Sequence, residues 1–403
     1  MNAFNIMCKP IGATCNLNCT YCYYLEKQAL YAGTQLPRMS DALLEQFIRQ
    51  YIEQQDAPVI QFVWQGGEPT LLGIDFFKKV LALQKKYLAG TQKQIENALQ
   101  TNGTLLNDEW GAFLAENKFL VGISIDGPEA CHDANRRSRN GDKTWHKVMA
   151  GIELLKRYGV DFNTLTVVGE HNVHQPLDVY EFLREIGSQF IQFIPLVERP
   201  AGTADAPMRF AQSPDLATGT LGDPLVTPWS VKPEDYGKFL CKIYDTWVKR
   251  DVGQTFVQIF DVALCAWCGV PPGLCVFNET CGQAMALEHN GDVYACDHFV
   301  YPKYKLGNLL NGDSLGALAG TPTMKQFGEL KKNALPRVCR KCNVRFVCHG
   351  ECPKHRFMTS IDGEPGLNYL CAAYKTFFNH VAPTMKQMKQ LIEAERAPAE
   401  IMK

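Results

Sequence analysis

The sequence predicts an α/β protein in which a parallel β-sheet is followed by a cysteine-rich domain and a C-terminal helix. Up to about residue 196, short apolar runs alternate with amphipathic stretches of about 10–15 residues, which is the pattern of right-handed βαβ units. From residue 271 onward, Gly, Pro and Cys become dense. A chain of 403 residues, with 46% hydrophobic and 21% charged residues, is long enough for one large domain and a smaller one.

The first half of the chain contains six candidate strands separated by five helical patterns. We expect the strands at residues 4–9, 59–64, 94–100, 120–125, 162–168 and 190–194. We expect the helices at residues 41–54, 74–87, 108–117, 145–158 and 176–186. Residues 199–230 are rich in Pro, Gly, Ala and Thr and lack periodicity, which predicts a long surface loop.

The second half begins with two expected helices at residues 233–250 and 256–268. Residues 284–296 are typical of a short hairpin with Asn290-Gly291 as a type I′ turn. The last helix is expected at about residues 374–394. We therefore divide the chain into a core with a barrel-closing loop (1–230), linking helices (231–270), the cysteine-rich domain (271–375) and a C-terminal helix (376–403).

Composition argues against several classes of protein. The formal net charge of −1 provides no electrostatic attraction for nucleic acid. No apolar run approaches the roughly 20 residues that span a membrane, and the first residues lack the apolar segment of a signal peptide. Sixteen cysteines without an export signal argue against a disulfide framework. We expect a reduced, metal-binding, cytoplasmic protein.

Three cysteines with the spacing C-x3-C-x2-C follow the first strand: Cys15, Cys19 and Cys22. Three thiolates in one short loop can hold three irons of a 4Fe–4S cluster and leave the fourth iron open for chemistry. A zinc site is the alternative, because zinc also takes closely spaced cysteines. A closed zinc site needs a fourth ligand, however, and the nearest candidate, Cys8, lies on the other side of Pro10.

The strand at residues 59–64 is followed directly by Gln65-Gly66-Gly67-Glu68-Pro69. Two glycines at the end of a strand let backbone groups approach a ligand closely, because no Cβ is in the way. Together with the three-cysteine loop, this motif resembles the radical S-adenosylmethionine (SAM) superfamily. The resemblance implies a partial (β/α)6 barrel of the TIM type, a cluster that binds SAM, and a site in the loops that follow the strands. It also implies oxygen sensitivity, so we expect an anaerobic or microaerobic host.

Residues 275–371 contain eight cysteines, which suits two fully ligated clusters or two zinc sites. Their spacing, C-x5-C-x14-C followed by C-x2-C-x5-C-x3-C-x18-C, resembles the SPASM domain of peptide-modifying radical SAM enzymes. That resemblance implies two auxiliary 4Fe–4S clusters and hence three clusters in all. The nearer auxiliary cluster would be bound by Cys275, Cys281, Cys296 and Cys352, and the farther one by Cys339, Cys342, Cys348 and Cys371.

Five cysteines have no place in this scheme. We interpret Cys8, Cys131 and Cys241 as incidental or buried thiols. Cys265 and Cys268 form another C-x2-C pair, but they lie in a helical, aromatic-rich stretch without a second pair. No metal is therefore assigned to them, and their role stays open.

Longer stretches resemble anaerobic sulfatase-maturating enzymes. The matching segments include CNLNCTYCYYLEK, WQGGEPTLLG, QTNGTLLNDEW, FLVGISIDGP, NGDVYACDHFVYPKYKLGN and GECPKHRF. This resemblance implies an oxidoreductase that converts a Cys or Ser of a sulfatase to Cα-formylglycine through a 5′-deoxyadenosyl radical. The alternative is a SPASM-type peptide maturase that forms a thioether or another crosslink. From a different class, a silent electron carrier or zinc-stabilised interaction protein is disfavoured by the intact cysteine and GGEP motifs.

The resemblance places five residues around SAM: Tyr21, Gly67, Ser124, Arg136 and Val197. An Arg that faces the SAM carboxylate is chemically sensible, since its planar fork donates two parallel hydrogen bonds. Simpler roles stay open for three of the five. Tyr21 could pack the loop, Ser124 could cap the following turn, and Arg136 could belong to a solvated basic run.

Asp297 directly follows Cys296. In the matching position of the family an Asp serves as the general base that takes a proton from the substrate. A negatively charged cluster nearby should raise the pKa of this carboxylate and help it to accept a proton. The alternative is that Asp297 only caps the turn around the cluster.

The resemblance also implies the partners. The substrate would be an unfolded or nascent sulfatase polypeptide, and the electron donor a flavodoxin or ferredoxin. We expect no nucleic-acid or membrane partner, and a monomer. Whether the target residue is Cys or Ser is left open by the sequence.

Overall fold

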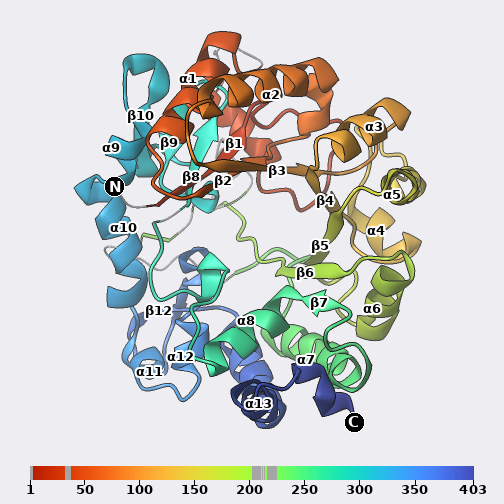
Figure 1. The fold of residues 1–403 in the computed structure, drawn as a ribbon. Coiled ribbons are helices and arrows are strands. Elements are labelled where there is room, and N and C mark those ends of the chain that lie inside the picture. Colours follow the sequence, from red (N-terminus) through yellow and green to blue (C-terminus); the bar gives the residue numbers. More distant parts are fainter. Residues whose placement is uncertain are drawn as a thin grey trace.

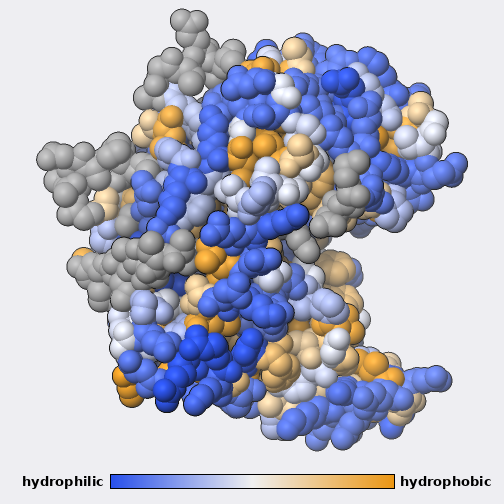
Figure 2. All heavy atoms as spheres, turned by 90° about the vertical axis from the view of Figure 1, so that its left-hand side faces the viewer, coloured by the Kyte–Doolittle hydropathy of each residue, from blue (hydrophilic) through white to orange (hydrophobic). Residues whose placement is uncertain are grey.

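One ten-stranded sheet organises the molecule. The computed structural model describes residues 3–31, 38–201, 210, 212, 214–215, 225–282 and 284–403. The strand order is β10-β9-β8-β1-β2-β3-β4-β5-β6-β7, and Figure 1 shows the sheet curving through the middle of the molecule. Turned by 90°, the surface is mostly hydrophilic, with a hollow at the right-hand edge of the view between the upper and lower parts (Figure 2).

The six strands expected from the sequence are confirmed to within one residue at each end. They are β1 (Asn5–Lys9), β2 (Val59–Trp64), β3 (Gln94–Thr101), β4 (Leu120–Ser124), β5 (Phe162–Val168) and β6 (Phe190–Pro195). Each pairs in parallel with the next. Their carboxyl ends therefore lie at one edge, where the loops of a barrel-type fold carry the site.

The outer side of this sheet is covered by helices, as Figure 1 shows. The expected helices are confirmed as α1 (Asp41–Glu53), α2 (Ile74–Leu88), α3 (Asp108–Glu116), α5 (Trp145–Tyr158) and α6 (Pro176–Glu185). Aromatic rings fill the space between α1, α2 and β2. The ring centres of Phe47 and Phe62 are 5.6 Å apart, and those of Trp64 and Phe77 are 6.0 Å apart. The short α4 (Glu129–Asn135) was not predicted, because seven residues are too few to show a helical period.

Three long helices close the lower end of the molecule in Figure 1. They are α7 (Pro233–Arg250), α8 (Gln258–Trp267) and α13 (Cys371–Glu393). The expected helix at residues 256–268 starts later, because β7 (Phe256–Val257) pairs in parallel with β6. The last helix begins at Cys371 rather than at residue 374, and a 3-10 turn at Pro398–Met402 follows it.

The expected hairpin is confirmed, but the type I′ turn predicted for it is wrong. It consists of β8 (Ala284–Glu288) and β9 (Asp292–Tyr294), which are antiparallel. The Gly291 N–H donates to the Glu288 carbonyl at 3.0 Å, and Gly291 alone has a positive φ, of 88°. A type I′ turn would need a positive φ at Asn290 as well, so the loop is the three-residue kind with a left-handed glycine. The hairpin also extends the main sheet, because β8 pairs in parallel with β1.

The remaining elements are short and belong to the cysteine-rich region. They are β10 (Lys305–Asn308), α9 (Leu315–Ala319), α10 (Pro322–Asn333), α11 (Arg337–Arg340), α12 (Arg345–Cys348), β11 (Met358–Thr359) and β12 (Pro365–Leu367). Much of the loop expected over residues 199–230 lies outside the described residues, namely 202–209, 211, 213 and 216–224.

Candidate active site

The three-cysteine loop begins where β1 ends, and its thiols converge. Burial raises the pKa of Cys15 to about 11 and that of Cys19 to about 12, and neighbouring cysteines of the loop add to both rises. Backbone N–H groups already point at the sulfur atoms: Leu17 donates to the Cys15 Sγ at 3.3 Å, and Leu25 donates to Cys22. Buried sulfurs that receive N–H donors suit metal-bound thiolates, so the loop fits a cluster held by three cysteines.

Gly67 brings the end of β2 against this loop. Its N–H donates to the Gly12 carbonyl at 2.7 Å. A Cβ built on Gly67 would lie only 1.9 Å from the Thr14 carbonyl oxygen. Any other residue would therefore have to move the cysteine loop.

Glu68 ties three segments together, a role that the sequence analysis did not assign. Its fully buried carboxylate accepts hydrogen bonds from the Thr101 hydroxyl at 2.6 Å and from the Asn102 N–H at 2.8 Å. The Asn102 side chain in turn donates to Asn16 of the cysteine loop at 2.9 Å. Burial raises the pKa of Glu68, and these donors oppose the rise. The signal available in the sequence was an acidic residue within the glycine-rich turn that follows a strand.

Asp126, just after β4, organises the opposite side of the site. Arg136 donates two hydrogen bonds to its carboxylate, at 3.0 and 3.1 Å, and the Tyr21 hydroxyl donates a third at 2.5 Å. Burial alone would raise the pKa of Asp126, but Arg136 and His171 hold it well below its usual range. Arg136 thus uses Nε and Nη2 on a protein carboxylate and keeps Nη1 for another acceptor. It is 7% exposed, so the solvated basic run considered for it is wrong.

The other predicted SAM residues lie at the same edge of the sheet. Ser124 is the last residue of β4, and its hydroxyl accepts a hydrogen bond from the Gln100 side chain at 3.2 Å. Val197 is buried just beyond β6. Gly67, Tyr21 and the Asp126–Arg136 pair lie beside the thiols of the cysteine loop. That they bind SAM stays a prediction.

Asp297 lies between two neighbours that act on different oxygens. Its Oδ1 pairs with the ammonium of Lys9, and its Oδ2 accepts a hydrogen bond from the Tyr23 hydroxyl at 2.7 Å. Burial alone would raise the pKa of Asp297, but Lys9 above all, with His298, lowers it to about 2. The side chains around Asp297 therefore oppose the raised pKa that the sequence argument expected from a cluster.

The eight C-terminal cysteines form two separate groups. In the first, the pKa of Cys296 is raised by burial, by Asp297 and then by Cys275 and Cys281. The pKa of Cys352 is raised by burial, by Glu351 and then by Cys296 and Cys281. The members of the second group line one pocket of about 90 Å³ together with Tyr374 and Lys375; they are Cys339, Cys342, Cys348 and Cys371. The structure thus places Cys352 with the earlier cysteines, as the resemblance implied. That each group binds a cluster stays a prediction.

The remaining cysteines lie apart from these groups. Cys8 is buried in β1 and Cys131 in α4, whereas Cys241 is half-buried in α7. Cys265 and Cys268 are half-buried near the end of α8, and burial raises the pKa of both.

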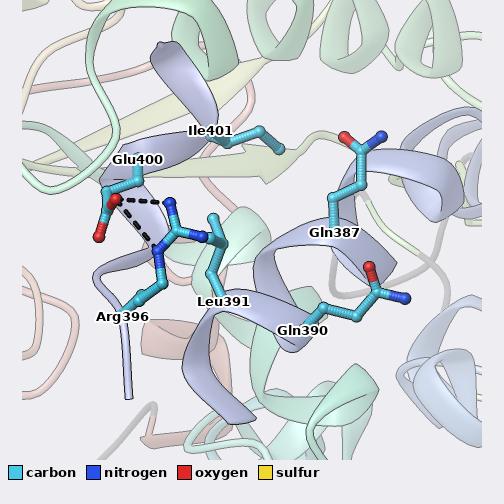
Figure 3. A pocket seen from close by; sticks show the side chains of 6 residues that line it. All are labelled: Gln387, Gln390, Leu391, Arg396, Glu400 and Ile401. Atoms are coloured by element: carbon cyan, nitrogen blue, oxygen red, sulfur yellow. Dashed lines mark hydrogen bonds and ion pairs between the residues drawn. The ribbon is translucent and has the colours of Figure 1, made fainter. Parts of the chain in front are cut away.

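A cavity of about 360 Å³ lies far along the chain from the cysteine loop, between α13 and the C-terminal turn. Its lining residues are Gln387, Gln390, Leu391, Arg396, Glu400 and Ile401. Figure 3 shows that Arg396 and Glu400 bond to each other at its side. These lining residues include neither a thiol nor a histidine, so we assign the cavity no part in the chemistry.

Two families of domain match this chain. Residues 10–183 match the radical SAM superfamily, and residues 275–343 match the SPASM iron-sulfur cluster-binding domain. Among the described residues, no helix is both long enough and apolar enough to span a bilayer.

Several named proteins are similar over nearly their whole length. The serine-type anaerobic sulfatase-maturating enzyme of Bacteroides thetaiotaomicron is 48% identical over 398 residues, covering 99% of this chain and 94% of that protein. The cysteine-type enzyme of Clostridium perfringens is 34% identical, with 96% and 98% covered. The solved structure of native anSMEcpe with bound AdoMet and Cp18Cys peptide has a TM-score of 0.82 at 32% identity, covering 97% of this chain and all of that one. SuiB of Streptococcus suis, at 14% identity, a TM-score of 0.58 and coverage of 92% and 76%, shares the fold.

Proposed function

Because this chain belongs to the anaerobic sulfatase-maturating enzymes, a family of radical SAM oxidoreductases, we propose that it oxidises a serine of a sulfatase polypeptide to Cα-formylglycine. The observation that carries the proposal is the 48% identity, over 99% of the chain, to an enzyme named serine-type. The cysteine-type relatives are more distant, at 34% identity or less. Serine is therefore the favoured target and cysteine the second.

Another peptide modification is not favoured. A thioether- or crosslink-forming maturase was the alternative, and SuiB, solved with its precursor peptide SuiA, represents a distant SPASM-type fold. At 14% identity that likeness concerns the fold alone, whereas the sulfatase-maturating enzymes match throughout.

The cysteine loop and its surroundings fit a cluster and SAM. A cluster held by Cys15, Cys19 and Cys22, together with SAM, would supply the radical chemistry that takes a hydrogen atom from the substrate Cβ. In this proposal the backbone of Gly67 receives the methionine part of SAM. Glycine has no side chain to stand in the way, and its close approach to Thr14 leaves no room for one. The free Nη1 of Arg136 donates to the SAM carboxylate, while Asp126 holds the guanidinium in place.

Asp297 takes the proton that the substrate loses in this scheme. The serine side chain loses one hydrogen atom from Cβ, one proton from its hydroxyl and one electron, which together leave the aldehyde. Asp297 stays ionised because Lys9 and Tyr23 stabilise its negative charge, so the carboxylate carries no proton before the substrate binds; the same contacts lower its pKa and make it a weaker base. Because Lys9 and Tyr23 hold both oxygens of Asp297, they also fix the direction from which the proton must approach the carboxylate.

The two groups of C-terminal cysteines hold auxiliary 4Fe–4S clusters in this proposal. The ligands of the nearer one are Cys275, Cys281, Cys296 and Cys352, and those of the farther one are Cys339, Cys342, Cys348 and Cys371. When bound, these clusters accept the electron that the substrate loses. Support comes from the match of residues 275–343 to an iron-sulfur domain and from the pocket that the second group lines.

The remaining features of the proposal concern partners and organisation. The substrate is an unfolded sulfatase segment, the reductant is a flavodoxin or ferredoxin, and the protein is a cytoplasmic monomer. We keep the division into a core (1–230), linking helices (231–270), a SPASM domain (271–375) and a C-terminal helix (376–403). The helices α7, α8 and α13 at the expected places support that division.

The test is an anaerobic assay of reconstituted protein with SAM, a reductant and two sulfatase peptides that differ only in a Ser or Cys at the target. Mass spectrometry should find the aldehyde in the serine peptide, formed at least as fast as in the cysteine peptide. A crosslinked product, or no change in either peptide while SAM is consumed, would show that the proposed function is wrong.

A further inference from the structure

A buried lysine beside the site has no role in the chemistry described so far. Lys27 lies in the 3-10 segment Leu25–Tyr31, five residues after Cys22, and is only 1% exposed. Among the described residues its Nζ has no hydrogen-bond partner, and it lies 3.4 Å from the centre of the Tyr301 ring. The ring offsets only part of the hydration that a buried ammonium loses, so three N–H donors are left without an acceptor.

Lys27 lies close enough to Asp297 for their charges to interact. Its charge interacts, in order of size, with Glu26, Lys354, Glu198 and Asp297. Lys354 pairs with Glu198, and its ammonium lies 4.6 Å from the centre of the Tyr23 ring. Because the Tyr23 hydroxyl binds Asp297, these contacts lead step by step from the proposed general base to the surroundings of Lys27.

The charges around Lys27 indicate what kind of ligand it takes. Lys9 is paired with Asp297, and Lys354 with Glu198, so both of these lysines already have acceptors. Glu26 is the carboxylate whose charge acts most strongly on Lys27 and would repel a ligand anion, whereas Glu198 and Asp297 are paired with their own lysines. A neutral hydrogen-bond acceptor does not meet that repulsion, and the main-chain carbonyls of an extended polypeptide are such acceptors.

We propose that Lys27 binds the polypeptide substrate, with its Nζ donating a hydrogen bond to a main-chain carbonyl close to the residue being oxidised. This inference rests on the proposed function, since it takes the substrate to be a polypeptide. Lys27 is a positioning residue and not the proton acceptor. Lys27 therefore contributes to substrate binding. Its loss should lower the affinity for the peptide more than it lowers the reaction rate at saturating peptide.

The test measures the Kd of a fluorescently labelled, serine-containing sulfatase peptide for the anaerobically reconstituted holoenzyme with SAM and no reductant. Lys27→Met keeps the length of the side chain and removes the donor. We expect it to raise the Kd about tenfold or more, and Lys27→Arg to stay within about threefold of the wild type. Lys249→Met, at an exposed position of α7, is the control and should bind as the wild type does. Release of 5′-deoxyadenosine without peptide should be the same in all four proteins.

A second readout separates binding from a merely structural role. Burial lowers the pKa of Lys27 to about 7, so the ammonium is lost as the pH rises through that value. Peptide affinity of the wild type should therefore fall between about pH 6 and pH 8.5, and Lys27→Met should not show this fall. Glu26, Lys354, Glu198, Asp297 and Tyr301, which surround Lys27, are present in both proteins, so their effects cancel in the comparison.

The outcomes decide between the two proposals. Equal affinity of Lys27→Met and the wild type at both pH values would overturn the role of Lys27. If Lys27→Met does not fold, affinity of the wild type that is independent of pH would overturn it as well. A wild type that binds the peptide but forms no formylglycine would instead refute the proposed function, while the binding comparison still decides on Lys27.

Discussion

Among single side chains, Asp297 shows most clearly how the surroundings prepare a group for its task. Lys9 is buried and fixes one oxygen, and Tyr23 fixes the other. The Lys9 ammonium is itself 3.7 Å from the centre of the Tyr24 ring, which replaces part of its lost hydration. A carboxylate held in this way is ionised and oriented before substrate arrives, as a general base must be.

Asp297→Asn tests this assignment. The variant should keep its full iron content and still cleave SAM, because neither depends on the carboxylate. It should form formylglycine about a hundredfold more slowly or worse, since the proton acceptor is gone. Mass spectrometry of the peptide and chromatography of 5′-deoxyadenosine measure both steps. The exposed Asp75→Asn is the control, and near-normal product from Asp297→Asn would rule out Asp297 as the base.

Lys9→Met tests the ion pair in a different way. It leaves the Asp297 carboxylate without its cation in a site where Lys9 is 1% exposed. The free energy of unfolding should fall by about 3 kcal/mol, because an uncompensated charge then lies in the interior. Anaerobic denaturant titration measures this. The double variant Lys9→Met/Asp297→Asn should recover part of the loss. A single variant as stable as the wild type would mean that the pair does not matter.

Sequence reasoning reached these side chains unevenly. Tyr21, Arg136 and Asp297 were found because each lies in or beside a motif. Asp126, which binds both Tyr21 and Arg136, was noticed only as part of a turn. Lys9 and Lys27 gave no signal, because a lysine near a motif is ordinarily a solvated one. Only the fold shows that both are buried.

At the scale of elements, the close approach of Gly67 to the loop after β1 matters most. The end of β2 approaches the loop after β1 so closely that a Cβ at Gly67 would overlap the Thr14 carbonyl. Sequence reasoning could predict this in kind, since two glycines at a strand end permit a close approach. It could not identify the protein's own backbone as the neighbour.

Gly67→Ala should therefore displace the cysteine loop. We expect SAM affinity to fall about tenfold or more, because the backbone that receives SAM and the cluster loop can no longer keep their relative positions. Equilibrium binding of labelled SAM to the reconstituted protein measures the effect. Gly273→Ala is a matched control, since nothing lies within 4 Å of a Cβ there. Unchanged SAM affinity in Gly67→Ala would contradict the account of this contact.

The hairpin β8–β9 marks the limit of prediction for elements. Its existence followed from an Asn-Gly pair between apolar runs, but the turn type did not, because only one of the two residues takes the left-handed conformation. The pairing of β8 with β1 joins residues about 280 positions apart, and local patterns carry no information about such pairs. That pairing brings the segment after the hairpin close to β1, where Asp297 forms an ion pair with Lys9, the last residue of β1.

Considered as one structure, the molecule is built on one ten-stranded sheet to which the cysteine-rich domain is attached by its hairpin, and β11 and β12 form a separate two-stranded sheet. The first group of auxiliary cysteines includes Cys296, next to Asp297, whereas the second group lines its own pocket among α11, α12 and α13. The overall order of domains could be predicted from composition and motifs. The distribution of cysteines between the groups came from a resemblance and stays a prediction.

The separation of the groups predicts that clusters can be lost one at a time. Cys342→Ser should lower the iron content by about a third of the roughly twelve irons that three cubanes contain. Cleavage of SAM driven by dithionite should continue, because the first cluster is untouched, and formylglycine should decrease. Iron analysis and the peptide assay measure these effects. Cys268→Ser should keep all its iron, and equal iron loss in both variants would contradict the assignment of ligands.

The central claim is that a radical made from SAM removes a hydrogen atom from the Cβ of the target residue. The most direct test uses a sulfatase peptide whose target serine carries deuterium at Cβ, incubated anaerobically with reconstituted protein, SAM and reductant. The deuterium should appear in the 5′-deoxyadenosine, and this nucleoside should form together with formylglycine. Aldehyde produced with unlabelled 5′-deoxyadenosine, or labelled nucleoside without any aldehyde, would contradict it.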